Sequence, residues 1–161
     1  MPGILIIAHA PLASALRACA EHVYGSTPAG LEALDVQPDA DTQALLSQAQ
    51  RAIARLAADG GEVLVLADTA GATPCNTARR LVFDVAGDAR LRLVGGVNLP
   101  MLLRCLCYRR EGLDRLVERA IEGGRRAISE IEADAAPCAQ PAPREPCAAA
   151  AAPCPCPDST S

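Results

Sequence analysis

The sequence predicts an α/β fold of three layers (helix, sheet and helix) around a mostly parallel sheet of four to five strands. Two observations lead to this prediction. Short runs rich in Leu, Val and Ile, typical of strands buried on both faces, alternate with longer stretches in which apolar residues recur at helical spacing. Strict alternation of strand and helix favours parallel strands joined by right-handed crossovers. Strands are expected at residues 3–8, 31–36, 62–67 and 91–94, and helices at 12–24, 42–58, 74–85, 99–108 and 113–131.

The first strand and helix have the clearest patterns. The run Gly-Ile-Leu-Ile-Ile-Ala at residues 3–8 is uninterrupted and rich in branched aliphatics. After Pro11, the apolar residues expected to form the buried face of the first helix are Leu12, Ala15, Leu16, Cys19, Ala20 and Val23.

Three later segments carry signals for where helices start and end. Asp41 or Thr42 can cap the helix at 42–58, because both side chains accept hydrogen bonds from the first helical N–H groups. Thr73 followed by Pro74 is typical of a helix start, with the hydroxyl as cap and Pro in the first turn. Propensity predicts that the last helix continues through residues 125–131.

Length and composition indicate a single domain and argue against nucleic-acid binding. The chain has 161 residues, 50% of them hydrophobic, and a net charge of −4, so we expect a single core. Only Tyr24, Phe83 and Tyr108 are aromatic. Because nucleic-acid binding favours a basic face and stacking aromatics, we expect no such partner. The first apolar run is too short to span a bilayer and ends at Pro11, so we expect no membrane insertion and a cytoplasmic location.

The composition changes near residue 134. Residues 1–133 are expected to form the domain, whereas residues 134–161 are rich in Ala, Pro and Cys, lack apolar periodicity and are expected to be a disordered tail. In that tail Cys154 and Cys156 have no His or second spaced pair beside them, so we expect no metal site. Four other cysteines lie in helical patterns and are interpreted as small apolar residues: Cys19, Cys75, Cys105 and Cys107.

Polar residues follow two of the expected strands at their carboxyl ends. His9 follows the first strand and Asp68 follows the third. Loops at the carboxyl ends of parallel strands meet at one edge, where open α/β sheets bind their ligands. A histidine there can carry a proton, a metal or a phosphoryl group near neutral pH. Asp68 either orients the imidazole through one ring N–H, which leaves the other nitrogen as a nucleophile, or caps its own loop.

The loop after the third strand has the composition of an anion site. Unpaired N–H groups and the helix dipole favour a phosphoryl group at a helix start, and a hydroxyl there adds a donor. The predicted phosphate-binding residues are Gly71, Ala72 and Thr73. Asn76, in the first turn, and Asn98, at the start of the next helix, are candidates for supporting the site. Beside His9, this loop predicts a pocket for a phosphoryl group carried on nitrogen.

These segments resemble the mannose-type (mannose/fructose/sorbose) IIA component of the bacterial phosphoenolpyruvate:sugar phosphotransferase system. The similarity lies in His9 after its aliphatic run, in Asp-Thr-Ala-Gly-Ala-Thr-Pro-Cys-Asn at residues 68–76, and in Gly-Val-Asn-Leu-Pro-Met-Leu-Leu at 96–103. The resemblance covers residues 1–133. It implies that the phosphocarrier protein HPr phosphorylates His9, that Asp68 supports the imidazole, and that Thr73 lies beside the phosphate.

The resemblance has two further implications. It implies a homodimer in which the chain near residues 125–131 adds an antiparallel edge strand to a partner subunit, and this is the alternative to helix there. Ala72 departs from the pattern, because the family usually has glycine at this position. No IIB domain follows in this sequence, so a separate IIB-type protein or a regulatory target is expected as the acceptor.

The predicted function is therefore that of a phosphotransferase. It accepts a phosphoryl group from phospho-HPr on His9 and passes it to a IIB-type protein, with no metal or cofactor. Two alternatives stay open. One is a regulatory protein whose phosphorylation state is a signal and which moves no sugar. The other is a phosphotransfer subunit of a dihydroxyacetone kinase, although the run Asn-Leu-Pro-Met at 98–101 favours the mannose type.

Overall fold

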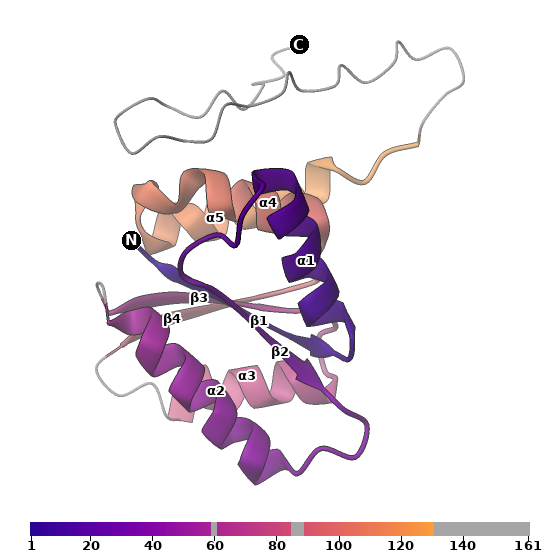
Figure 1. Cartoon of the computed structure of the whole chain (residues 1–161), viewed down its shortest axis with the longest axis vertical. Coiled ribbons are helices and arrows are strands. Elements are labelled where there is room, and N and C mark those ends of the chain that lie inside the picture. The colour runs from indigo at the N-terminus through magenta and orange to yellow at the C-terminus, as the bar shows by residue number, and fades with distance from the viewer. Residues whose placement is uncertain (59–60, 85–88, 131–161) are drawn as a thin grey trace.

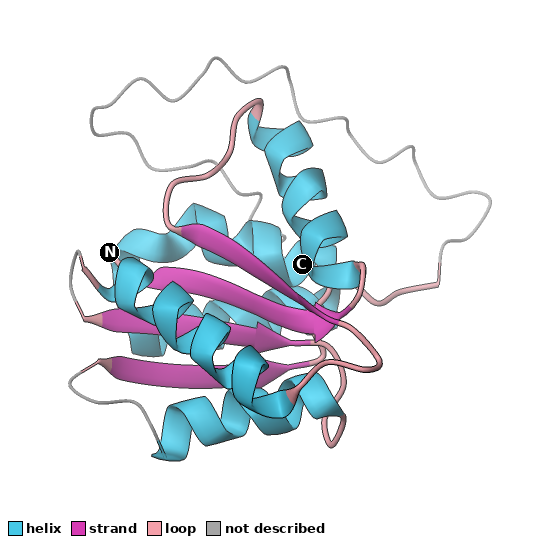
Figure 2. Cartoon of the chain, turned by 60° about the horizontal axis from the view of Figure 1, so that its bottom comes forward, coloured by secondary structure: helices cyan, strands magenta, loops and turns pink. Residues whose placement is uncertain are grey.

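The strands form one parallel sheet whose spatial order differs from their order along the chain. The computed structural model describes residues 1–58, 61–84 and 89–130. Its strands are β1 (Gly3–His9), β2 (Leu31–Val36), β3 (Glu62–Ala67) and β4 (Arg90–Gly95), arranged β2-β1-β3-β4. All the neighbouring strands pair in parallel, so every strand ends at the same edge of the sheet (Figure 2). The predicted fold class is confirmed.

Helices cover both faces of the sheet. On one face lie α1 (Leu12–Tyr24), α4 (Leu99–Tyr108) and α5 (Leu113–Arg126), and on the other lie α2 (Thr42–Ala57) and α3 (Thr73–Asp84) (Figure 1). A short 3₁₀ helix, η1 (Arg109–Glu111), joins α4 to α5.

Strand β1 belongs to both hydrophobic cores, which explains why its sequence is wholly apolar. Ile4 and Ile6 pack in the core under α1, α4 and α5, whereas Leu5 and Ile7 pack in the core under α2 and α3. All four side chains are 0% exposed. Burial of each stabilises the fold by about 1.5–3 kcal/mol. Because its side chains are packed on both faces, β1 cannot change its register against its neighbouring strands. The position of His9, at the end of this strand, is therefore fixed.

The predicted buried face of the first helix is partly wrong. Leu16 and Ala20 are buried as predicted, but the third buried residue is Ala13. The predicted core residues that are exposed instead are Leu12, Ala15, Cys19 and Val23. Two adjacent stripes of α1 are apolar, and packing against β1, β2 and α4 selects the stripe that contains Leu16.

The other cysteines of the described helices follow the prediction more closely. Cys75 and Cys105 are buried, and Cys107 is half-buried. Burial raises the pKa of the Cys105 thiol to about 12, so this thiol stays protonated at neutral pH. Cys105 therefore acts as a small apolar residue, as the sequence predicts.

Three described helix boundaries differ from the prediction, and the smallest difference is in α2, which ends at Ala57 and not at residue 58. Helix α3 begins at Thr73, so this residue is the first of the helix and not the cap before it. Helix α5 ends at Arg126, and residues 127–130 form a turn and an irregular segment, so a helix over 113–131 is too long.

Within the described residues the sheet has no antiparallel strand. The predicted tail, 134–161, lies outside the described residues, and none of the described helices is long and apolar enough to cross a membrane.

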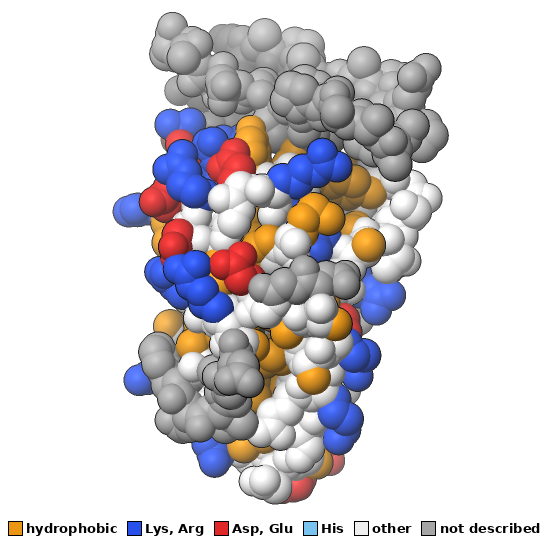
Figure 3. Space-filling model, turned by 90° about the vertical axis from the view of Figure 1, so that its left-hand side faces the viewer, with side chains coloured by type: hydrophobic (Ala, Val, Ile, Leu, Met, Phe, Trp, Pro, Cys, Tyr) orange, Lys and Arg blue, Asp and Glu red, His pale blue; other side chains and the backbone are white. Residues whose placement is uncertain are grey.

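The face near the start of the strands carries Arg and acidic side chains close together (Figure 3). Arg90 and Arg92, on β4, both donate to Asp114, at 2.6 and 2.9 Å. Exposed pairs of this kind contribute about 0–1 kcal/mol each. Their main effect is that charges of both signs neutralise each other on this surface.

Candidate functional site

His9 and Asp68 contact each other at the ends of neighbouring strands. His9 is the last residue of β1, and Asp68 directly follows β3. Asp68 Oδ2 accepts two hydrogen bonds from His9, one from the backbone N at 2.9 Å and one from imidazole Nδ1 at 2.7 Å. Asp68 Oδ1 accepts a third from Thr69 N at 2.7 Å. The carboxylate thus has both roles that the sequence left open, since it orients the imidazole and caps its own loop.

These contacts determine which nitrogen of His9 is free. An ionised carboxylate only accepts hydrogen bonds, so Nδ1 carries the proton and Nε2 of the neutral ring keeps its lone pair. Burial acts to raise the pKa of Asp68, but the hydrogen bonds from His9 and Thr69 outweigh it and hold this pKa below its usual value. The Asp68 side chain is 8% exposed, whereas that of His9 is 54% exposed. The result is a shielded, ionised carboxylate behind an accessible imidazole.

The loop from Asp68 to α3 is held by hydrogen bonds within itself. Ala72 N donates to Thr69 O at 3.3 Å, and Asn76 Nδ2 donates to Gly71 O at 3.1 Å. Gly71 has φ +86°, a left-handed conformation that strains any residue with a Cβ. Asn76 therefore supports the predicted phosphate loop and reaches His9 only through that loop.

The loop after β4 lies at the same edge of the sheet. Gly96 N donates to Asp68 O at 2.8 Å, and Val97 N donates to Ala67 O at 3.0 Å. The three loops that follow β1, β3 and β4 thus meet around Asp68, as predicted. The start of α3 lies at the end of the sheet where β1 finishes (Figure 1), although no hydrogen bond between described residues joins the Thr73 side chain to His9.

Asn98 has a structural role in the described part of the chain. Its Oδ1 accepts from Met101 N at 2.9 Å, which caps α4. Its Nδ2 donates to Gly124 O at 3.2 Å, which joins α4 to α5. One end of the amide thus caps α4 and the other joins it to α5, and no hydrogen bond between described residues joins Asn98 to His9 or Asp68.

Asp35 is a polar residue near His9 that no motif in the sequence marks. It lies on β2, where it is opposite Ala8, and the next residue, Val36, is opposite His9. Asp35 Oδ1 accepts from Ser14 N, in the first turn of α1, at 3.1 Å. The sequence signal for it is an acidic residue near the carboxyl end of a predicted strand.

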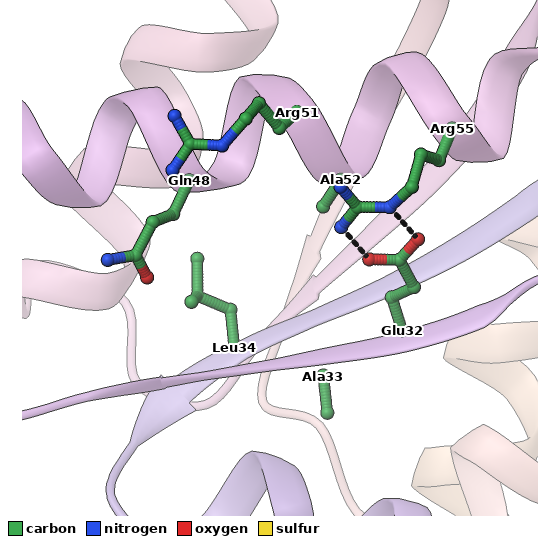
Figure 4. A pocket seen from close by; sticks show the side chains of 7 residues that line it. All are labelled: Glu32, Ala33, Leu34, Gln48, Arg51, Ala52 and Arg55. Atoms are coloured by element: carbon green, nitrogen blue, oxygen red, sulfur yellow. Dashed lines mark hydrogen bonds and ion pairs between the residues drawn. The ribbon is translucent and has the colours of Figure 1, made fainter.

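Two hollows in the described surface lie away from His9. One, of about 210 Å³, lies between β2 and α2 (Figure 4), where Arg55 donates to both carboxylate oxygens of Glu32 at 3.0 and 2.6 Å. The other, of about 430 Å³, includes Gly3 at the start of β1 and the half-buried Arg109. Neither is lined by His9 or Asp68. An accessible imidazole outside these hollows suits a reaction with a group presented by another protein.

Known proteins are similar in sequence to most of this chain. Residues 3–121 match the family model described as "PTS system fructose IIA component". The mannose-specific EIIAB component of the PTS system from Escherichia coli (strain K12) is 33% identical over 143 residues, which cover 88% of this chain and 43% of that protein. The corresponding protein of Shigella flexneri gives the same values. The chain therefore spans less than half the length of these curated relatives.

Solved structures share its fold. The phosphotransferase system component EIIA from Streptococcus agalactiae has a TM-score of 0.72 and 25% identity, over 81% of this chain and 97% of that one. The mannose/sorbose specific IIA subunit from Enterococcus faecalis has a TM-score of 0.67 and 25% identity, over 81% of this chain and 95% of that one.

Proposed function

Since this chain belongs to the mannose/fructose-type IIA components of the sugar phosphotransferase system, we propose that it carries the phosphoryl group on His9. IIA components of this system transfer phosphoryl groups. The observation that supports His9 as the carrier is its contact with Asp68, at 2.7 Å through Nδ1, which leaves Nε2 free.

The proposed reaction is an in-line transfer between two imidazoles. The lone pair of His9 Nε2 forms a bond to phosphorus while the bond from phosphorus to the donor's histidine nitrogen breaks, and that electron pair returns to the donor ring. The His9 ring keeps its proton on Nδ1 and becomes positively charged. The Asp68 carboxylate stabilises this charge, so positioning and electrostatics supply most of the catalysis.

We place the phosphoryl oxygens at the loop of Gly71, Ala72 and Thr73. Backbone N–H groups at the start of α3, the dipole of this helix and the Thr73 hydroxyl all favour an anion there. The support is the position of this loop, which begins at Asp68 and leads directly into α3.

The proposed donor is phospho-HPr, and the proposed acceptor is a IIB-type protein. The curated relatives are named EIIAB components and are more than twice as long as the matched region, whose share of them is 43%. We propose that residues 1–133 act as the carrier domain in the cytoplasm.

A homodimer is part of the proposal. Strand β4 lies at one edge of the sheet, and an uncovered edge strand offers its backbone N–H and C=O groups to another strand. The segment that follows α5, near residues 125–131, would supply this strand to the partner subunit.

The test is phosphorylation by labelled phosphoenolpyruvate, enzyme I and HPr. The wild-type chain should gain an acid-labile label that is lost in His9→Ala. His22→Ala is the matched control, because His22 is an exposed histidine of α1, and it should keep the label. Full labelling of His9→Ala would contradict the proposal.

A second step of the same assay separates the candidate acceptors. The labelled chain should pass its phosphoryl group to a mannose-type IIB protein. Transfer only to dihydroxyacetone kinase, or to neither protein, would favour the kinase subunit or the regulatory role instead.

A further inference from the structure

Helix α1 begins close to the proposed nucleophile, but the residue at its N-cap position supplies no side-chain hydrogen bond to its first turn. Only Ala10 and Pro11 separate His9 from Leu12, where the helix begins. Pro11 stands at the N-cap position without a side-chain hydrogen bond, and the first turn contains no acidic residue. The N–H groups of a first helical turn need acceptors from outside the helix.

The neighbouring strand β2 supplies this acceptor. Asp35 Oδ1 accepts from Ser14 N at 3.1 Å. Ser14 is the third residue of α1, the position that an N-cap side chain usually serves. The backbone of β2 holds the other side of the same turn, because Ala10 N donates to Val36 O at 3.0 Å. Two consecutive residues of β2 therefore hold the chain on both sides of Pro11.

We propose that Asp35 is a positioning residue for phosphoryl transfer. It caps α1 from β2, holds the turn after His9, and so fixes the direction in which the imidazole presents Nε2. The inference rests on the proposed function, because it concerns the reaction at His9.

Three variants of Asp35 separate position from charge. Asp35→Ala removes the acceptor and should slow single-turnover transfer from phospho-HPr to His9 by about tenfold, with little change in KM, because it disturbs orientation and not docking. Asp35→Glu keeps the charge but moves the carboxylate by one methylene, so it should be slowed to a similar degree. Asp35→Asn keeps an acceptor oxygen at the same place and should retain at least about half of the wild-type rate.

Asp41→Ala is the matched control. Asp41 caps α2 by accepting from Ala44 N at 2.9 Å and from Gln43 N at 3.4 Å, and α2 does not follow His9. Its loss should lower thermal stability as much as the loss of Asp35 but leave the rate of transfer within about twofold of wild type. Amide exchange of Ser14 should quicken in Asp35→Ala and Asp35→Glu only.

The outcomes distinguish this inference from the proposed function. A wild-type chain that takes no label from phospho-HPr overturns both. A labelled wild type with Asp35→Ala at the same rate overturns only the role of Asp35, and so does an Asp35→Asn variant as slow as Asp35→Ala, since charge would then matter more than position. Should Asp35→Ala not fold, the comparison of the Asn and Glu variants decides.

Discussion

The connections after β1 and β3 reach the same edge of the sheet but are held in different ways. The turn from His9 to α1 is held from outside, by Asp68 on one side and by β2 on the other. Asp68 itself is held from outside, by His9 and by Gly96 N, but the rest of the loop to α3 is held from within, by hydrogen bonds that close on Thr69 and Gly71. The proposed nucleophile is thus placed by its neighbouring strands, whereas the proposed phosphate loop is shaped mainly by its own residues. Changes at the first should alter the chemical step, and changes at the second should alter how the phosphoryl group is bound.

The largest effect is expected from Asp68→Asn, which changes the contact between the two connections. Both carboxylate oxygens accept hydrogen bonds, and an amide can replace only one of them, so either His9 or Thr69 faces an NH₂ group. The charge proposed to stabilise the phosphorylated ring is also lost. Single-turnover transfer should fall on the order of 100-fold, the usual size for loss of a preorganised electrostatic partner.

Glu62→Gln is the control for this variant. It removes a carboxylate at the start of β3, where Glu62 accepts from Arg90 at 3.1 Å. Transfer should stay near the wild-type rate. Equal rates for Asp68→Asn and wild type would show that Asp68 only caps its loop.

The same carboxylate should make stability depend on pH. The pKa of Asp68 is lower in the folded chain than its usual value of about 3.9. Its stabilising contribution is therefore fully present above about pH 4 and is lost as pH falls through the folded-state pKa. The free energy of unfolding of Asp68→Asn, measured by urea titration, should lie below that of wild type at pH 7 and approach it below about pH 4. A gap that is constant between pH 7 and pH 3 would contradict this.

The parts of the site held by strand register could be predicted from the sequence. Parallel strands end at one edge, so the positions of His9 and Asp68 after two aliphatic runs were enough to bring them together. The hydrogen bonds within the loop of Gly71 were not predicted: the sequence indicated unpaired N–H groups there, whereas Ala72 N donates to Thr69 O.

What could not be predicted depends on which surfaces face each other. The pattern of α1 contains two apolar stripes, and only the packing of the helix shows that Ala13 is buried and Leu12 exposed. Asp35 likewise gains its role from the pairing of β2 with β1, which brings residues 35 and 14 together. Periodicity carries information about one element at a time, so contacts between elements lie beyond it.

Gly71→Ala tests the loop that is shaped from within. A φ of +86° strains any residue with a Cβ, although nothing lies within 4 Å of that position. The cost should be about 1–2 kcal/mol, and a loop that relaxes to avoid it moves its N–H groups away from the phosphoryl site. Transfer should fall by about tenfold, measured as the single-turnover rate.

Gly25→Ala is the matched control for this substitution. Gly25 caps the far end of α1 with φ +72°, and nothing lies within 4 Å of the place that its Cβ would take. It should lose similar stability with no change in transfer. A slow Gly25→Ala would mean that general destabilisation, and not the shape of the loop, limits the reaction.

Asn76→Ala should have the smallest effect of these substitutions. The amide of Asn76 donates to Gly71 O at 3.1 Å in an exposed hydrogen bond, and among the described residues its side chain has no other hydrogen bond. Its loss should cost about 0.5 kcal/mol and slow single-turnover transfer by about twofold, because the loop is loosened but keeps its path. Ser47→Ala, which removes an exposed bond from Ser47 Oγ to Gln43 O at 2.9 Å on α2, should cost similar stability and leave the rate unchanged. If Asn76→Ala were slower than Gly71→Ala, the amide would have to bind the phosphoryl group itself, and its role would not be limited to holding the loop.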